Sequence, residues 1–216
     1  MGVQVAPDDT IWFAEQFANY LGHYFPETGR YQLYPLPRLT IPDPGHADQL
    51  LSLPSAPNEL ALDAHGDVWF TEAGTNELGR LDPTTGALQL FAVPDSHALL
   101  MEIASDRQGN LWATAFTPGL LFRFKPVTKT FTVYTAPLSG SERSAFYGLL
   151  VTKSGSVWVT ILAENVIARL DIATGRFIYY RIPTPGSLPL GITMDANQHL
   201  WFTGIDRIGT LSPERP

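Results

Sequence analysis

The chain has 216 residues, of which 44% are hydrophobic and 16% are charged, and its formal net charge is −7. This length can bury a sizeable core as one or two domains, and the acidic balance argues against nucleic acid as a partner. No apolar run approaches the roughly 20 residues of a membrane span, and no Lys/Arg-rich run suits an anionic membrane surface. The N-terminal stretch shows no signal-peptide pattern, and the absence of Cys excludes disulfides and thiolate chemistry, which leaves the compartment open.

One segment recurs along the chain, centred each time on a Trp and spaced by 43 to 57 residues. In chain order the five residues are Trp12, Trp69, Trp112, Trp158 and Trp201. An alternating run precedes each Trp, and two more short runs rich in Val, Ile, Thr and aromatic residues follow it in most repeats. Gly, Pro, Asn and Asp separate the runs. This pattern is typical of short strands joined by tight turns, and no long run has a helical period.

Four short strands per repeat, at a period near 43, predict an all-β fold: a β-propeller of four-stranded antiparallel blades. We expect a single domain over 1–216, with blades at about 1–37, 57–94, 100–137, 146–183 and 190–216. The Trp residues should be buried between successive blades, since one blade cannot cover its own two apolar faces.

The last repeat stops after its third strand, which predicts an unpaired edge near Ile208 to Leu211. Such an edge favours self-association. A five-bladed ring and a part of a longer propeller both remain open.

The extra length between the first two repeats lies in the segment 38–56, within "RLTIPDPGHADQLLSLPSAPN". It is Pro-rich, and we expect it to be irregular. It is either a tolerated surface insertion or a lid over the mouth of the propeller channel.

Two segments carry a family resemblance: "DVWFTEAGTNELGRLDPTTGALQLFAVP" and "IARLDIATGRFIYYRIPTPGSLPLGITMDANQHLWFTG". They resemble the virginiamycin B lyase (streptogramin B lyase) family. The resemblance implies a seven-bladed propeller that opens a cyclic depsipeptide by β-elimination with a divalent metal. It also implies a His base on the first strand of a blade and a metal-binding Glu fourteen residues later, at the end of W-F-T-E. The base would take the acidic proton while the metal polarises the carbonyl.

The family's functional positions are only partly filled in this chain. The Glu position holds Glu15, Glu72, Ala115, Ile161 and Gly204 in the five repeats. The His position holds Asn58, Met101, Tyr147 and Leu190 in the last four. The five His residues lie elsewhere, so the sequence favours a ligand-binding platform over an enzyme. A metal-assisted lyase or lactone hydrolase acting at the channel mouth remains the alternative.

Carboxylates cluster in the first three repeats, because Glu59 and Glu102 stand where the family has Gly. With Glu15 and Glu72 as metal ligands, they predict a site for Mg²⁺ or Ca²⁺. Solvated carboxylates around an open channel are the other interpretation. We predict a small-molecule ligand at the central channel, contacting residues at these places, and no nucleic-acid or membrane partner. The expected contacts are Asn58, Glu59, Glu102 and Tyr147.

A second, weaker resemblance rests on "APNELALDAHGDVWFTE", which is similar to a segment of the SMP-like sugar-lactonase propellers. It implies that Asn58 is a metal ligand. The recurring Arg80, Arg123 and Arg169 are expected to be structural, because a residue that recurs in successive blades serves the blade itself.

Overall fold

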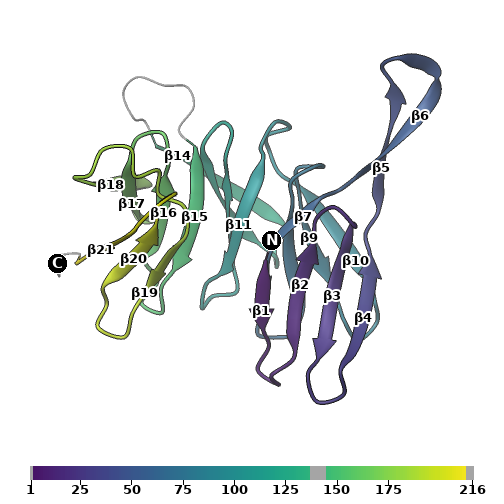
Figure 1. The fold of residues 1–216 in the computed structure, drawn as a ribbon, viewed down its shortest axis with the longest axis horizontal. Coiled ribbons are helices and arrows are strands. Elements are labelled where there is room, and N and C mark those ends of the chain that lie inside the picture. Colours follow the sequence, from purple (N-terminus) through teal and green to yellow (C-terminus); the bar gives the residue numbers. More distant parts are fainter. Residues whose placement is uncertain (1, 137–144, 213–216) are drawn as a thin grey trace. The chain divides into compact units, whose positions relative to one another are not determined.

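This computed structural model describes residues 2–136 and 145–212, which divide into two compact units, Met1–Ser96 and His97–Pro216. Every described sheet is antiparallel, and none of the described residues forms a helix (Figure 1). The all-β prediction is therefore confirmed. No membrane-spanning helix occurs among these residues either.

The first unit holds two four-stranded sheets whose strands pair in chain order. The first sheet is β1 (Val3–Val5), β2 (Ile11–Glu15), β3 (Tyr20–Phe25) and β4 (Arg30–Pro35). The second sheet is β7 (Pro57–Leu62), β8 (Val68–Glu72), β9 (Glu77–Leu81) and β10 (Leu88–Ala92).

The second unit holds two more sheets of the same kind and a three-stranded one. The third sheet is β11 (Leu100–Ser105), β12 (Leu111–Ala115), β13 (Leu120–Lys125) and β14 (Thr130–Thr135). The fourth is β15 (Phe146–Val151), β16 (Val157–Ile161), β17 (Val166–Asp171) and β18 (Arg176–Arg181). The last is β19 (Ile192–Met194), β20 (Leu200–Thr203) and β21 (Ile208–Leu211). Strand β21 has no fourth strand beside it among the described residues, so self-association at this edge stays a prediction.

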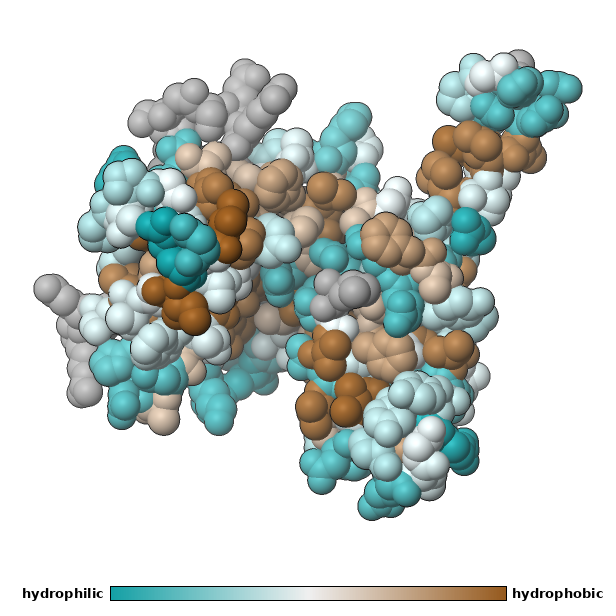
Figure 2. Space-filling view, in the orientation of Figure 1, coloured by the Kyte–Doolittle hydropathy of each residue, from teal (hydrophilic) through white to brown (hydrophobic). Residues whose placement is uncertain are grey.

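The Pro-rich insertion is a β-ribbon, so the expectation of irregular structure is wrong. It consists of β5 (Arg38–Asp43) and β6 (His46–Pro54), paired antiparallel with a register shift beside the turn. Figure 1 shows the ribbon standing out from the sheets of the first unit, and Figure 2 shows apolar atoms along it. A two-stranded ribbon has two edges, and Pro is tolerated at an edge because its missing N–H can face solvent.

Trp burial follows the repeat with one exception. Trp12, Trp69, Trp112 and Trp158 are buried as predicted, whereas Trp201 is 41% exposed. Where the following sheet belongs to the same unit, the buried Trp packs against it. Trp158, for instance, packs with Leu200 and Phe202 of the last sheet. Trp201 lies on the last described sheet, and no further described sheet covers it. The predicted burial of Trp201 is therefore wrong, because a Trp is buried only where a neighbouring sheet packs against its ring.

Candidate ligand site at the bulged strand ends

The predicted ligand contacts lie on β-bulges where the first strand of a blade begins. The register shifts between Pro57 and Leu60, between Leu100 and Ile103, and between Phe146 and Leu149. The bulged pairs are therefore Asn58–Glu59, Met101–Glu102 and Tyr147–Gly148. Bulges bend a strand and redirect its side chains, and they are frequent beside functional sites.

A Thr hydroxyl on the second strand holds each bulge. In the fourth blade the Gly148 amide donates to Thr160 Oγ1 at 2.7 Å, and Thr160 donates to the Leu190 carbonyl of the next sheet at 2.7 Å. Thr114 likewise donates to the Tyr147 carbonyl at 2.7 Å. A Cβ on Gly148 would lie 2.1 Å from the Leu190 oxygen, so this close approach requires glycine. The same amide-to-hydroxyl bond recurs at Glu59–Thr71, Glu102–Thr114 and Gly191–Thr203.

The first blade fixes its neighbour's bulge by a different group. Ala14 stands where the other blades have Thr, and here the Gly2 amide donates to the Asn58 carbonyl at 2.7 Å. A Cβ on Gly2 would lie 2.3 Å from Glu59 Oε1. Burial raises the pKa of Glu59 above its ordinary value, while the hydrogen bond from the Leu60 amide opposes that rise. The structure thus brings Asn58 and Glu59 together beside Gly2.

Glu72 is the most enclosed of the predicted site residues, with a side chain that is 0% exposed. Its Oε2 accepts a hydrogen bond from Thr75 at 2.7 Å, and its Oε1 has no partner among the described residues. Burial raises the pKa of Glu72, hydrogen bonds from Thr75 and Ser55 lower it, and the nearby charge of Glu77 raises it further. Glu77 lies directly opposite Glu72 in the strand register, and the sequence analysis did not identify it.

A buried Asn connects this carboxyl region to both ends of the ribbon. Asn19 Nδ2 donates to the carbonyls of Leu36 at 2.8 Å and Pro37 at 3.1 Å, just before β5. Asn19 Oδ1 accepts from Ser55 Oγ at 3.1 Å and from the Ala56 amide at 3.3 Å, just after β6. One side chain therefore closes the base of the ribbon and positions Ser55 near Glu72.

The two predicted metal ligands, Glu15 and Glu72, differ in burial. Glu15 occupies the position of Glu72 in the first blade, yet its side chain is exposed. Within residues 2–136 and 145–212, no three His, Asp or Glu side chains gather as a metal-binding group. Glu72 Oε1, which has no hydrogen-bond partner among the described residues, would suit a cation. The Mg²⁺ or Ca²⁺ site therefore stays a prediction.

Glu102 and Tyr147 belong to the second unit, whereas the other predicted site residues belong to the first. The Glu102 amide is bonded to Thr114 at 3.2 Å, and the half-buried Tyr147 is anchored by its carbonyl. The comparison of repeats missed the Thr that holds each bulge, although it recurs two residues after four of the five Trp residues.

The His residues have local partners rather than places on the bulges. His23 Nε2 lies 2.7 Å from Thr10 Oγ1, its ring stacks on Trp12 at 4.0 Å, and burial lowers its pKa. His46 lies 3.3 Å from Asp43 on the ribbon. None of the described first strands places a His at its bulge.

Comparison with known proteins identifies a family and similar folds. The model of the virginiamycin B lyase family matches residues 38–215. Virginiamycin B lyase from Staphylococcus aureus is similar in structure, with a TM-score of 0.83 and 26% identity over 100% of this chain and 67% of that chain. The same values hold for a catalytically inactive histidine-to-alanine variant of that enzyme with quinupristin.

More distant structures agree in fold alone. A streptogramin B lyase structure has a TM-score of 0.70 and 22% identity over 100% of this chain and 80% of that chain. A protein of the gluconolactonase kind has a TM-score of 0.69 and 16% identity over 98% of this chain and 73% of that chain. No match was found among curated protein sequences.

Proposed function

The chain belongs to the virginiamycin B lyase family, and we propose that its bulged strand ends bind a small molecule without supplying the family's elimination base. The observation that carries this proposal is the occupancy of the bulges. Asn58, Met101 and Tyr147 stand at the His position. An amide and a thioether cannot take up a proton at neutral pH, and a neutral phenol is a poor base.

The bulges favour binding because they are held in place before a ligand arrives. The Tyr147 carbonyl is fixed by Thr114, and the Gly148 amide by Thr160. A preorganised surface loses less conformational entropy on binding. In the similar S. aureus enzyme, the inactive histidine-to-alanine variant is described with quinupristin, which supports ligand binding without the base.

A metal-assisted lyase or lactone hydrolase is the second candidate, and Glu72 favours it. A buried carboxyl group with a raised pKa and one unpaired oxygen is a common feature of catalytic sites. The chain spans 67% of the S. aureus enzyme, so the activity of that whole protein is not transferred to this one.

Titration calorimetry with quinupristin tests the binding proposal. We expect the wild-type chain to bind, and Tyr147→Ala to bind about tenfold more weakly, because a half-buried aromatic ring supplies much of a contact surface. Val127→Ala is the matched control, since Val127 is 98% exposed in a turn and should leave affinity unchanged. No measurable heat with the wild-type chain would contradict the proposal.

Chromatography with mass detection separates binding from the two reactions. Elimination opens the quinupristin ring without changing its mass, whereas hydrolysis adds one water. We expect neither product with or without Mg²⁺. Ring opening that is lost in Glu72→Gln would replace the binding proposal with the second candidate.

A further inference from the structure

The fourth blade departs from three of the other four repeats at the turn after its first strand. In the second, third and last repeats, an Asp six residues before the Trp accepts the indole N–H, at 2.9, 3.0 and 3.0 Å. The first repeat has Ala6 at this place and the fourth has Thr152. Trp158 Nε1 is buried and has no hydrogen-bond partner among the described residues. A buried N–H without an acceptor is rare, because its lost hydration is not replaced.

The Arg of the fourth blade also lacks the acid that its equivalent has. In the second blade, Arg80 Nε donates to Asp67 Oδ2 at 2.9 Å. Ser156 stands at the position of Asp67 in the fourth blade. Arg169 forms no salt bridge with any described residue, and Asp171 attracts it only over a longer distance. Its guanidinium lies over the Trp158 ring, 5.7 Å from the centroid. Two neighbouring donors have thus both lost a carboxylate partner.

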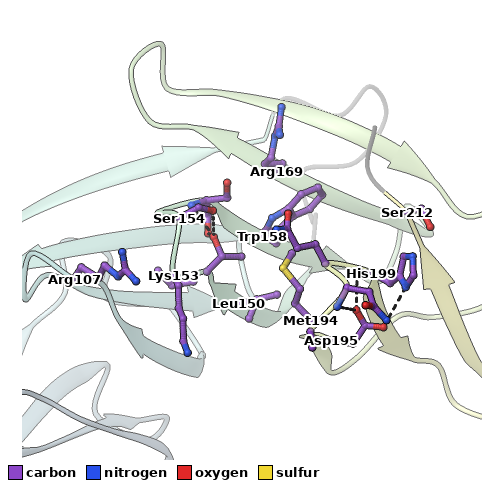
Figure 3. Close-up of a pocket in the computed structure, with 16 residues that line it drawn as sticks. Arg107, Leu150, Lys153, Ser154, Trp158, Arg169, Met194, Asp195, His199 and Ser212 are labelled. Carbon is purple, nitrogen blue, oxygen red and sulfur yellow. Dashed lines mark hydrogen bonds and ion pairs between the residues drawn. The ribbon is translucent and has the colours of Figure 1, made fainter. Parts of the chain in front are cut away.

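These two donors line a pocket of about 1190 Å³ within the second unit (Figure 3). Arg107 and Lys153 add two further cations to its wall. The acid in the lining is Asp195, whose carboxylate already accepts the Trp201 N–H, two backbone amides and a His199 contact. The pocket therefore has an excess of positive charge and no carboxylate left for Trp158 and Arg169.

An apolar wall completes the pocket. Leu150, Val151 and Met194 belong to its lining, and Figure 3 shows Leu150 and Met194 beside Trp158. A ligand that suits this surface carries an anionic group at one end and an apolar body at the other. Ligand pockets commonly combine an apolar lining with a few convergent polar groups.

We propose that this pocket binds a small organic carboxylate whose carboxylate replaces the missing Asp. The carboxylate of the ligand accepts a hydrogen bond from Trp158 Nε1 and pairs with the guanidinium of Arg169. A planar carboxylate matches the planar geometry of a guanidinium. Trp158 Nε1 is shielded from solvent, so the carboxylate reaches it only when a side chain of the lining moves, such as Thr152 at the position of the missing Asp. Thr152 Oγ1 is held by Ser154 Oγ at 2.9 Å and by the Ser156 backbone. The pocket lies at the end of the fourth blade opposite Tyr147, so it does not depend on the proposed function.

Benzoate and its neutral isostere benzamide test the proposal in the indole N–H region of a ¹H–¹⁵N spectrum. The Trp158 resonance is identified by its loss in Trp158→Phe. We expect benzoate, at constant ionic strength, to shift this resonance in a saturable way, and benzamide to leave it in place. Arg169→Gln should weaken benzoate binding by about tenfold, because it removes the charge but keeps a polar side chain of similar reach.

Thr152→Asp gives the decisive variant, since it supplies the carboxylate that the second, third and last repeats have at this position. We expect it to raise the melting temperature without ligand and to abolish the benzoate response, while Thr152→Val keeps that response. Equal shifts with both probes, or a benzoate response that survives Thr152→Asp, would overturn the proposal. If Thr152→Asp does not fold, Arg169→Gln decides alone: unchanged benzoate affinity in that variant overturns it.

Discussion

The fourth blade and the last sheet carry the same Trp in opposite situations. Trp158 is 2% exposed and its N–H is unpaired, whereas Trp201 is 41% exposed and its N–H is bonded to Asp195 at 3.0 Å. The comparison shows that two properties of one repeated residue have separate causes. The next sheet decides whether the ring is buried, and a single residue in the local turn decides whether the N–H is paired.

The largest expected difference comes from removing the two rings. Trp158→Ala should cost about 3–5 kcal/mol of unfolding free energy, because it leaves a cavity against Leu200 and Phe202. Trp201→Ala should cost about 1 kcal/mol, since much of its ring already contacts solvent. Urea denaturation of both variants checks this. Equal losses would show that something other than the described sheets covers Trp201.

The Thr hydroxyls give an intermediate contrast between the same two regions. Thr160 is buried and links the Gly148 amide to the Leu190 carbonyl, so Thr160→Val should cost about 1–3 kcal/mol. Thr203 is exposed and accepts only from Gly191 among the described residues, so Thr203→Val should cost less than about 1 kcal/mol. The midpoints of urea denaturation, analysed with the same dependence of unfolding free energy on urea concentration, compare the stabilities of the two variants. A larger loss in Thr203→Val would break the comparison.

The smallest effect is a dependence on pH at the turn before the Trp, where the last sheet has Asp195 and the fourth blade has Thr152, which does not titrate. Hydrogen bonds from the Trp201 indole and the His199 amide lower the pKa of Asp195 from 3.8 to about 2. A lowered pKa means that Asp195 stabilises the fold above about pH 4, and that this contribution disappears as the pH falls towards 2. The melting temperatures of the wild type and Asp195→Asn should therefore differ near neutral pH and converge near pH 2. Thr152→Val should shift the melting temperature equally at both pH values.

The strands were predictable because the same packing requirement recurs in every repeat. Each Trp-centred run has to pack against a neighbouring sheet, and the sequence contains five such runs. The exposure of Trp201 was not predictable, since it depends on what lies beyond the last described sheet. The ribbon was missed because Pro42 argues against a strand, and the edge of a two-stranded ribbon tolerates it.

The surroundings of Glu72 depend on contacts between residues far apart in sequence, such as Asn19 and Ser55. A signal for this network did exist. Asn19, Asn76 and Asn165 recur after the second strand, each with a positive φ near 60°, and each donates to a carbonyl past the fourth strand. An Asn that tolerates this backbone and also bonds across a connection marks an anchor point. Its recurrence predicts the anchor, but the burial of the Glu at the end of the second strand is particular to the second blade, since Glu15 in the first blade is exposed.

The anchoring of the ribbon makes it an exchangeable cassette. Arg38 and Pro54 are cross-strand partners, so the chain enters and leaves the ribbon at adjacent points. Asn19 holds the backbone on both sides of those points. Residues 39–53 can therefore be exchanged for a shorter turn or a foreign epitope while the two flanking blades keep their attachment, and natural variation in length would be absorbed at the same junction.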